Sequence, residues 1–158
     1  MAKISEIMLL QQAVQPALTI EVQTNISGLP RAIGESFMKI ASYLEMQEVV
    51  TTDIPFVIYK DFESMTEHTI KIIAGFKLSK PLPGKEEIKC IELPGQKIAS
   101  CLHRGNYNEL ANLYKEMSEW IKSKGYDAEG SSLEYYYTGP GVPENEQVTR
   151  IEMPLRAD

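Results

Sequence analysis

Short apolar stretches separated by turn residues run along the whole chain, and they predict a fold built largely from strands. Runs of four to ten residues that are rich in Val, Ile and aromatic side chains are typical of strands that are at least half buried. The predicted strands are residues 7–10, 18–22, 56–59, 69–78, 88–93, 97–103, 133–138 and 147–155. Pro94-Gly95 lies between two of them and predicts that they form a hairpin.

A first helix is predicted after Ser27-Gly28, with Pro30 at its first position. Its apolar residues recur at the three- and four-residue spacing that places them on one face. They are Ile33, Phe37, Ile40, Ala41 and Leu44. This stripe predicts a helix that packs on a sheet.

A second helix is predicted to begin at Asn106 as its N-cap, with Glu109 as the partner in a capping box, and to end near Gly125. Its apolar stripe consists of Leu110, Tyr114, Met117, Trp120 and Ile121. Like the first helix, it has one face suited to burial on a sheet.

The second half of the chain repeats the first at an offset of 77 residues. At this offset Tyr59 falls on Tyr136, and Val57 falls on Glu134. The two helix stripes also coincide, with Ile33, Phe37, Ile40, Tyr43 and Leu44 falling on Leu110, Tyr114, Met117, Trp120 and Ile121, and Leu78 falls on Leu155 in the last strand. The alternative is a pair of unrelated helices that each pack on a sheet.

The repeat predicts an α+β fold for a single domain over residues 1–158, with pseudo-repeats at roughly 5–80 and 85–156. Two tandem strand-helix-strand-strand modules would form one largely antiparallel sheet, with two main helices on one face and a central ligand cleft. Pro81-Leu82-Pro83-Gly84 is the most linker-like stretch and is the expected boundary between the halves.

Composition narrows the possible partners. The chain has 158 residues, a net charge of −6 and no basic cluster, which argues against direct binding of nucleic acid. No apolar run is long enough for a signal peptide or a membrane span, so a cytoplasmic location is expected. Two cysteines do not suggest a disulfide framework, and His68 and His103, expected at the surface or a strand edge, lack ligand spacing. We therefore expect neither a metal nor a cofactor.

The strand at 133–138 carries three consecutive tyrosines and one carboxylate. Glu134, Tyr136 and Thr138 are predicted to share one face, and Leu133, Tyr135 and Tyr137 the other. A carboxylate among aromatic rings is costly unless a cation or a proton meets it, which makes Glu134 the first candidate functional residue. The alternatives are a Glu at the solvent rim, or one held by a structural Arg.

The predicted pseudo-twofold axis would place an apolar, aromatic groove around this single carboxylate. Its candidate ligand-binding residues are Glu134, Tyr136, Tyr59, Tyr43, Trp120, Tyr107, Tyr114 and Val57. Such a groove favours a bulky hydrophobic ligand, above all a delocalised cation. Ordinary core packing is the alternative for the helix aromatics. The face at Tyr135 and Tyr137 is compatible with a dimer, so either a monomer or a homodimer is expected.

Several motifs together resemble a known family. They are Gly105-x-Tyr107-x-x-Leu110-x-x-x-Tyr114-x-x-x-x-x-Trp120-Ile121-x-x-x-Gly125, then Glu134-x-Tyr136 with Gly139-Pro140, a closing Thr149-x-Ile151-x-x-Pro154, and in the first half Pro55, Tyr59 and Asp61. This set resembles the GyrI-like small-molecule-binding domains, also called effector-binding domains of bacterial AraC- and MerR-type transcription activators.

The resemblance implies a duplicated strand-helix-strand-strand fold and a cleft in which Glu134 meets lipophilic cationic compounds. Some members stand alone without a DNA-binding domain, as we expect here, and some of these resemble hydrolases that open cyclopropane rings. Others bind gyrase or haem. The chain departs from the family at Arg150, where many members carry an acid. Arg150 near Glu134 or Tyr136 would offset the carboxylate, and Glu152 is a possible substitute acid on the same strand face.

These observations support two main hypotheses. The first is a non-enzymatic module that senses or sequesters a lipophilic, cationic, drug-like molecule. The second is a hydrolase of strained electrophiles such as cyclopropanes, in which Glu134 is the general base and Tyr136 or Tyr59 donates to the developing oxyanion. A protein-interaction role such as gyrase modulation is a third, weaker alternative.

Overall fold

The computed structural model describes residues 3–60, 68–139 and 141–157 and shows an α+β protein of two compact units. Unit 1 comprises residues 1–12 and 96–158, and unit 2 comprises residues 13–95. The predicted fold class and the antiparallel pairing of the strands are confirmed. No helix in the described ranges is both long and apolar enough to cross a membrane.

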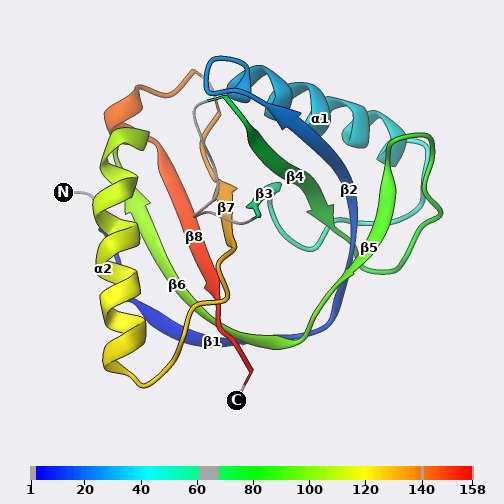
Figure 1. Ribbon diagram of the computed structural model, residues 1–158. Coiled ribbons are helices and arrows are strands. Elements are labelled where there is room, and N and C mark those ends of the chain that lie inside the picture. Colours follow the sequence, from blue (N-terminus) through cyan, green and yellow to red (C-terminus); the bar gives the residue numbers. More distant parts are fainter. Residues whose placement is uncertain (1–2, 61–67, 140, 158) are drawn as a thin grey trace. The chain divides into compact units, whose positions relative to one another are not determined.

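Unit 1 is a four-stranded antiparallel sheet with one helix along it (Figure 1). The strands, in sheet order, are β1 (Met8–Gln12), β6 (Gln96–Arg104), β8 (Val148–Pro154) and β7 (Ser132–Tyr136). The helix α2 (Leu110–Ser123) follows a short 3-10 turn, η2 (Tyr107–Glu109), and a second turn, η3 (Glu144–Glu146), precedes β8.

Unit 2 has the same plan. Its strands, in sheet order, are β3 (Phe56–Tyr59), β4 (Ile70–Lys77), β2 (Gln15–Thr24) and β5 (Lys89–Leu93), and its helix is α1 (Leu29–Leu44). Pro30 lies in the first turn of α1, as predicted. Its fixed φ suits that position, where its missing N–H would have no partner in the helix.

Each helix buries the face that its apolar stripe predicted. In unit 1, Leu113 and Met117 of α2 pack with Ala99 and Cys101 of β6 and with Ile151 of β8. In unit 2, Ile40 of α1 is fully buried and packs with Leu18 and Ile20 of β2. Burial of such side chains contributes about 25 cal/mol for each Å² of apolar surface removed from water.

The internal repeat is confirmed in the strand registers. Val57 of β3 lies opposite Ala74 of β4, and 77 residues later Glu134 of β7 lies opposite Ile151 of β8. The long first strands also correspond, but at an offset of 81 residues. Ala17 is opposite Lys77, whereas its counterpart Ile98 is opposite Pro154. The stretch from β6 to the β7–β8 hairpin is therefore four residues shorter than the stretch from β2 to the β3–β4 hairpin.

Three local predictions are wrong. Pro94-Gly95 does not close a hairpin, because β5 pairs with β2 in unit 2 while β6 pairs with β1 and β8 in unit 1. The division between units thus falls at residues 95–96 and 12–13, and not at Pro81–Gly84. The capping box is also absent, since Asn106 makes no side-chain cap and α2 begins only at Leu110, after η2.

Candidate functional site

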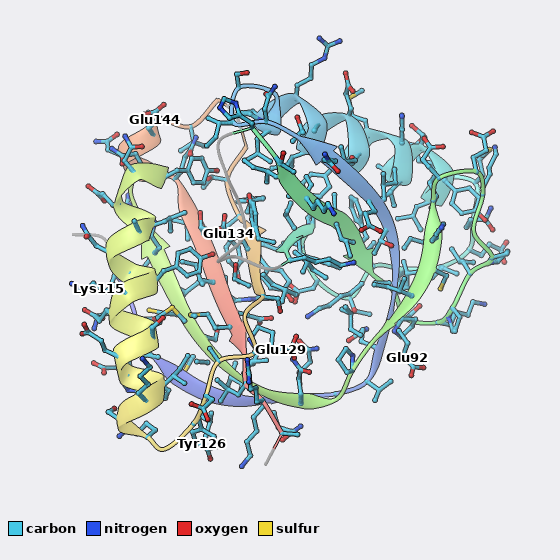
Figure 2. All side chains as sticks on the ribbon, viewed as in Figure 1. Glu92, Lys115, Tyr126, Glu129, Glu134 and Glu144 are labelled. Atoms are coloured by element: carbon cyan, nitrogen blue, oxygen red, sulfur yellow. The ribbon has the colours of Figure 1, made fainter. Side chains whose placement is uncertain are left out.

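The carboxyl group of Glu134 lies inside unit 1, on the face of β7 that α2 covers (Figure 2). Only 7% of the residue is exposed. Tyr114 of α2 donates a hydrogen bond of 2.5 Å from Oη to Glu134 Oε2, and Tyr136 of β7 donates one of 2.9 Å from Oη to Oε1. Both carboxyl oxygens are therefore fixed by tyrosine hydroxyls from two different elements.

Ser132 extends this hydrogen-bonded group. Its Oγ lies 3.3 Å from Tyr114 Oη. A tyrosine has one hydroxyl proton, and Tyr114 gives it to Glu134 at the shorter distance, so the Ser132 hydroxyl is left to donate to Tyr114 Oη. Ser132 belongs to none of the sequence motifs, although its position two residues before Glu134 places it on the same strand face.

Burial raises the pKa of the Glu134 carboxyl above its ordinary value of 4.5, while the hydrogen bonds from Tyr114 and Tyr136 partly oppose that rise. The loss of water around the charge is the larger effect, because a carboxylate is much better solvated by water than by a protein interior. A nearby positive charge would therefore strongly stabilise the ionised form of Glu134, which burial disfavours.

Tyr107 adds a partly exposed aromatic ring at this group. Its ring meets that of Tyr136 edge to face, with 6.1 Å between centroids and an interplanar angle of 87°. The residue is 49% exposed, and its pKa is raised, first by burial of the hydroxyl and then by the charge of Glu134. Tyr107, Tyr136, Tyr114 and Glu134 thus form one cluster, which we call the tyrosine–carboxyl cluster.

No basic side chain neutralises Glu134 among the residues that the structure describes. The ion pairs there involve other carboxylates, and Arg150 in particular pairs with Glu152. The sequence left open whether Arg150 lies near Glu134 and offsets its charge, and the structure shows that it does not. Arg150 lies directly opposite Tyr135 in the β7–β8 ladder, and directly opposed residues share a face, so it is on the side of the sheet away from Glu134.

Arg150 belongs to a second buried group on that opposite face. Its guanidinium carbon lies 3.7 Å from the centroid of the Tyr135 ring, and its Nε lies 3.3 Å from Glu152 Oε2. Tyr135 Oη donates a 2.8 Å hydrogen bond to Glu152 Oε1, and Arg150 Nη1 donates one of 2.9 Å to Tyr137 Oη. Tyr135 is fully buried and Tyr137 is 46% exposed, so the predicted spare aromatic face is covered at Tyr135 and open at Tyr137.

The remaining predicted site residues are divided between the two units. Trp120 is partly buried beside the α2 core, with Lys124 Nζ 5.7 Å from its ring centroid. Val57 and Tyr59 are buried on β3 in unit 2, opposite Ala74 and Ile72. Their proposed part in ligand binding stays a prediction.

Tyr43 lies at a surface pocket of unit 2 with a volume of about 440 Å³. The pocket is lined by Met38, Lys39, Ser42, Tyr43, Met46, Lys85, Glu86, Glu87 and Ile88. Tyr43 Oη donates a 2.6 Å hydrogen bond to the Pro83 carbonyl, and the ring packs beside the core of unit 2. Its proposed role in ligand binding also stays a prediction.

His103 of β6 is fully buried, whereas the sequence predicted a surface or strand-edge histidine. Within the described parts of the chain, neither ring nitrogen has a hydrogen-bond partner, although Nε2 lies 3.8 Å from Glu109 Oε2. Burial lowers its pKa, which favours the neutral ring. Over the described part of the chain, no three His, Cys, Asp or Glu side chains are grouped so that they could hold a metal ion.

The family comparison matches nearly the whole chain. The family model described as the GyrI-like small molecule binding domain matches residues 5–156. No curated protein sequence matches the chain.

Solved structures share the fold at low sequence identity. The crystal structure of the EcmrR C-terminal domain has a TM-score of 0.77 and 19% identity, covering 97% of this chain and 98% of that chain. EcmrR in its DNA complex has a TM-score of 0.80 and 17% identity over 96% of this chain, which spans only 57% of the EcmrR chain.

Two further solved structures share the fold. A hydrolase from Listeria innocua has a TM-score of 0.70 and 11% identity, covering 96% of this chain and 92% of that chain. SAV2435, whose structure is described as bound to tetraphenylphosphonium, has a TM-score of 0.63 and 13% identity, with coverages of 96% and 94%. At these identities the similarity shows the fold alone.

Proposed function

Because the chain belongs to the GyrI-like small molecule binding domain family, we propose that it binds a lipophilic organic cation at the tyrosine–carboxyl cluster of unit 1. The chain would act as a sensor or a sequestering protein for that molecule. Glu134 supplies the counter-charge, and the rings of Tyr107 and Tyr136 supply aromatic surface.

One observation carries this proposal. Glu134 is a buried carboxyl group with two tyrosine donors but, within the described residues, no ion pair to a basic side chain. A buried carboxylate without a cation is costly, so a cationic ligand that arrives at this group recovers part of that cost on binding. A neutral ligand of the same shape gains no such electrostatic contribution.

The tyrosine rings favour a ligand whose positive charge is delocalised over an apolar body. A cation over the face of an aromatic ring gains about 0.5–2 kcal/mol, depending on how far it is desolvated. Tyr107 is half exposed next to Tyr136, so its ring is available to an incoming molecule. The description of SAV2435 as bound to tetraphenylphosphonium suggests this cation as the probe.

Calorimetric titration with tetraphenylphosphonium, and with neutral triphenylphosphine oxide for comparison, tests the proposal. We expect the wild type to bind the cation in preference to the neutral compound. The substitution Glu134→Gln keeps the size of the side chain, removes its charge and replaces one acceptor oxygen by an NH₂ donor. It should weaken cation binding by about tenfold to hundredfold, the range for losing a charged partner.

Glu152→Gln is the matched control. Glu152 is also buried, also accepts a tyrosine hydroxyl and lies on the neighbouring strand, but it faces away from Glu134. It should leave cation affinity within about twofold of the wild type. Equal loss of affinity in both variants, or no cation preference in the wild type, would count against the proposal.

A hydrolase is the second candidate function, and the raised pKa of Glu134 favours it. A carboxylate with a raised pKa is a stronger base. Glu134 would take a proton from water as the water oxygen bonds to a carbon of a strained ring, the ring bond breaks, and a tyrosine hydroxyl supports the negative charge on the leaving atom. Incubation with a cyclopropane electrophile, read by mass spectrometry for one added water, separates this function from binding alone.

A further inference from the structure

The outer edge of β1 is an unprotected strand edge, and we propose that it pairs with the β1 strand of a second copy of this chain. The sheet order places β1 at one end, hydrogen-bonded to β6 and to no further strand among the described residues. Alternate residues of an edge strand direct their N–H and C=O groups away from the sheet. Those groups form a template for another strand.

The side chains of this edge are apolar and exposed. Met8 is 47% exposed, Leu9 40% and Leu10 39%, and Ile4 and Val14 on either side are exposed at 46% and 59%. A contiguous exposed apolar segment is uncommon on a monomer's surface and is typical of an interaction site. Met8 and Leu10 lie on one face of β1 and Leu9 on the other, so exposed apolar side chains border this edge on both faces.

The internal repeat provides a comparison within the same chain. β5 is the outer strand of unit 2, as β1 is of unit 1, and it pairs with the long strand β2. Its exposed residues are the charged Lys89 and Glu92, while its apolar residues are at least partly buried. Charged residues on an edge strand discourage pairing with another chain. One of the two equivalent edges is thus protected by charge, and β1 is not.

The distribution of charge favours a second copy of the chain as the partner at the β1 edge. The chain carries a net charge of −6, so two copies repel each other in general. Residues 7–20 contain no charged side chain, so the β1 edge is a place where identical molecules can approach without placing like charges together. An antiparallel pair of identical strands also has twofold symmetry, the commonest symmetry of protein dimers.

The structure limits the pairing to a short segment. Lys3 lies opposite His103 and Met8 opposite Ser100, so five positions on one strand span only three on the other, and the chain bulges between them. Ser5 Oγ accepts a 2.9 Å hydrogen bond from the Leu102 N–H at this bulge. Bulges end regular pairing, which leaves Met8–Gln12 as the regular edge. Centring the twofold axis on Leu10 pairs Leu9 with Gln11 of the second copy and sets Leu10 against its own copy.

Sedimentation velocity over a roughly hundredfold range of protein concentration tests the proposal. Because the paired segment is short, we expect a wild-type dimer that dissociates on dilution. Leu10→Lys should remain monomeric over the whole range, because it sets two ammonium groups against each other across the axis. Met38→Lys is the matched control, since Met38 is 71% exposed on α1, and it should dimerise like the wild type.

Hydrogen exchange on the wild type gives a test that needs no variant. Amide protection over residues 7–14 should rise with concentration, while protection over β5 should not change. A wild type that stays monomeric, a dimer that survives Leu10→Lys, or protection that rises on another surface instead would each overturn the proposal. Far-ultraviolet circular dichroism identifies a misfolded variant, in which case the exchange measurement decides.

Discussion

Glu134 and Glu152 are buried carboxyl groups on adjacent strands, and each accepts a tyrosine hydroxyl, yet their electrostatic surroundings differ. Glu152 lies against Arg150, whereas the partners of Glu134 among the described residues are the hydroxyls of Tyr114 and Tyr136. Hydrogen bonds from neutral donors stabilise a carboxylate less than a cation does. The same residue type is therefore structural in one place and available to a charged ligand in the other.

The raised pKa of Glu134 predicts how stability changes with pH. A carboxyl with a raised folded-state pKa binds its proton more tightly in the folded chain, so its favourable contribution is complete below the unfolded value of 4.5 and is lost as pH rises through the folded pKa. Glu134→Gln resembles the protonated acid at every pH. Its Tm relative to wild type should thus rise as pH increases from 4.5 through the folded pKa, and then level off.

Thermal unfolding at a series of pH values measures this difference. Glu119→Gln on the exposed side of α2 is the control, and its Tm difference from wild type should stay nearly flat over the same range. A Glu134→Gln difference that is independent of pH would show that burial does not penalise the charge. Ligand binding should depend on the same ionisation of Glu134. A cation that needs the carboxylate should release a proton when it binds below the folded pKa of Glu134.

At the scale of elements, the β7–β8 hairpin presents different chemistry on its two faces. One face carries the tyrosine–carboxyl cluster, and the other carries Arg150 stacked on Tyr135 and paired with Glu152. The second group is largely closed to solvent and anchors the strand on which Glu134 lies. We infer that it serves to hold β7 in position.

Arg150→Ala should lower the free energy of unfolding by about 2–4 kcal/mol, because it removes the stacked guanidinium and leaves Glu152 buried without its cation. Urea denaturation measures the loss. Adding Glu152→Gln to that variant should recover part of it, since the unpaired charge is then gone. If the two substitutions are simply additive, the pair is not coupled, and this account of the opposite face is wrong.

The strands could be predicted because their apolar runs are local, and β3 was predicted with the bounds it has, Phe56–Tyr59. Partner choice could not be predicted, because β5 and β6 are close in sequence but pair with β2 and β1, which are distant along the chain. The position of Arg150 shows the same limit. The stretch between β7 and β8 is too long to fix a register, and a shift of one residue moves a side chain to the other face.

The site was predictable only in part for a related reason. Strand alternation placed Tyr136 and Glu134 on one face, and the structure joins them by a hydrogen bond. The contribution of Tyr114 depends on how α2 lies across β7, which no local pattern specifies, so its hydroxyl at 2.5 Å from Glu134 could not be derived from spacing alone. Core packing was an equally good interpretation of that residue.

For the whole molecule, the internal repeat separates what the fold requires from what one unit adds to it. At the 77-residue offset, Glu134 corresponds to Val57 and Tyr114 to Phe37, so unit 2 has apolar residues at these positions. The register is the same in both units. The carboxyl and its tyrosine donor are therefore not needed to form this architecture, which supports a functional origin for them.

Gly75 of unit 2 shows that the equivalent positions are not interchangeable. It corresponds to Glu152, and a Cβ added there would lie 2.8 Å from the Leu18 carbonyl oxygen and 2.9 Å from the Phe56 ring. Unit 2 thus closes this face of its sheet with the Phe56 ring close against the backbone. Unit 1 has the charged group of Arg150 and Glu152 at the corresponding place.

A carboxyl placed in unit 2, at the position that corresponds to Glu134, tests whether the fold is independent of this group. Val57 is fully buried opposite Ala74, so Val57→Glu should lower the free energy of unfolding by about 2–4 kcal/mol, the cost of burying a polar group without partners. Phe37→Tyr supplies a hydroxyl at the position that corresponds to Tyr114. Combined with Val57→Glu, it should recover about 1 kcal/mol, the typical value of one hydrogen bond.

Urea denaturation of the wild type, the two single variants and the double variant gives the coupling directly. Phe37→Tyr alone should change the free energy of unfolding by less than about 0.5 kcal/mol, because Phe37 is only partly buried. A positive coupling would show that the helix of each unit can supply the donor that keeps a carboxyl on the strand that follows that helix. Without coupling, the Tyr114–Glu134 bond would depend on features particular to unit 1, and the repeat would no longer support this account of the site.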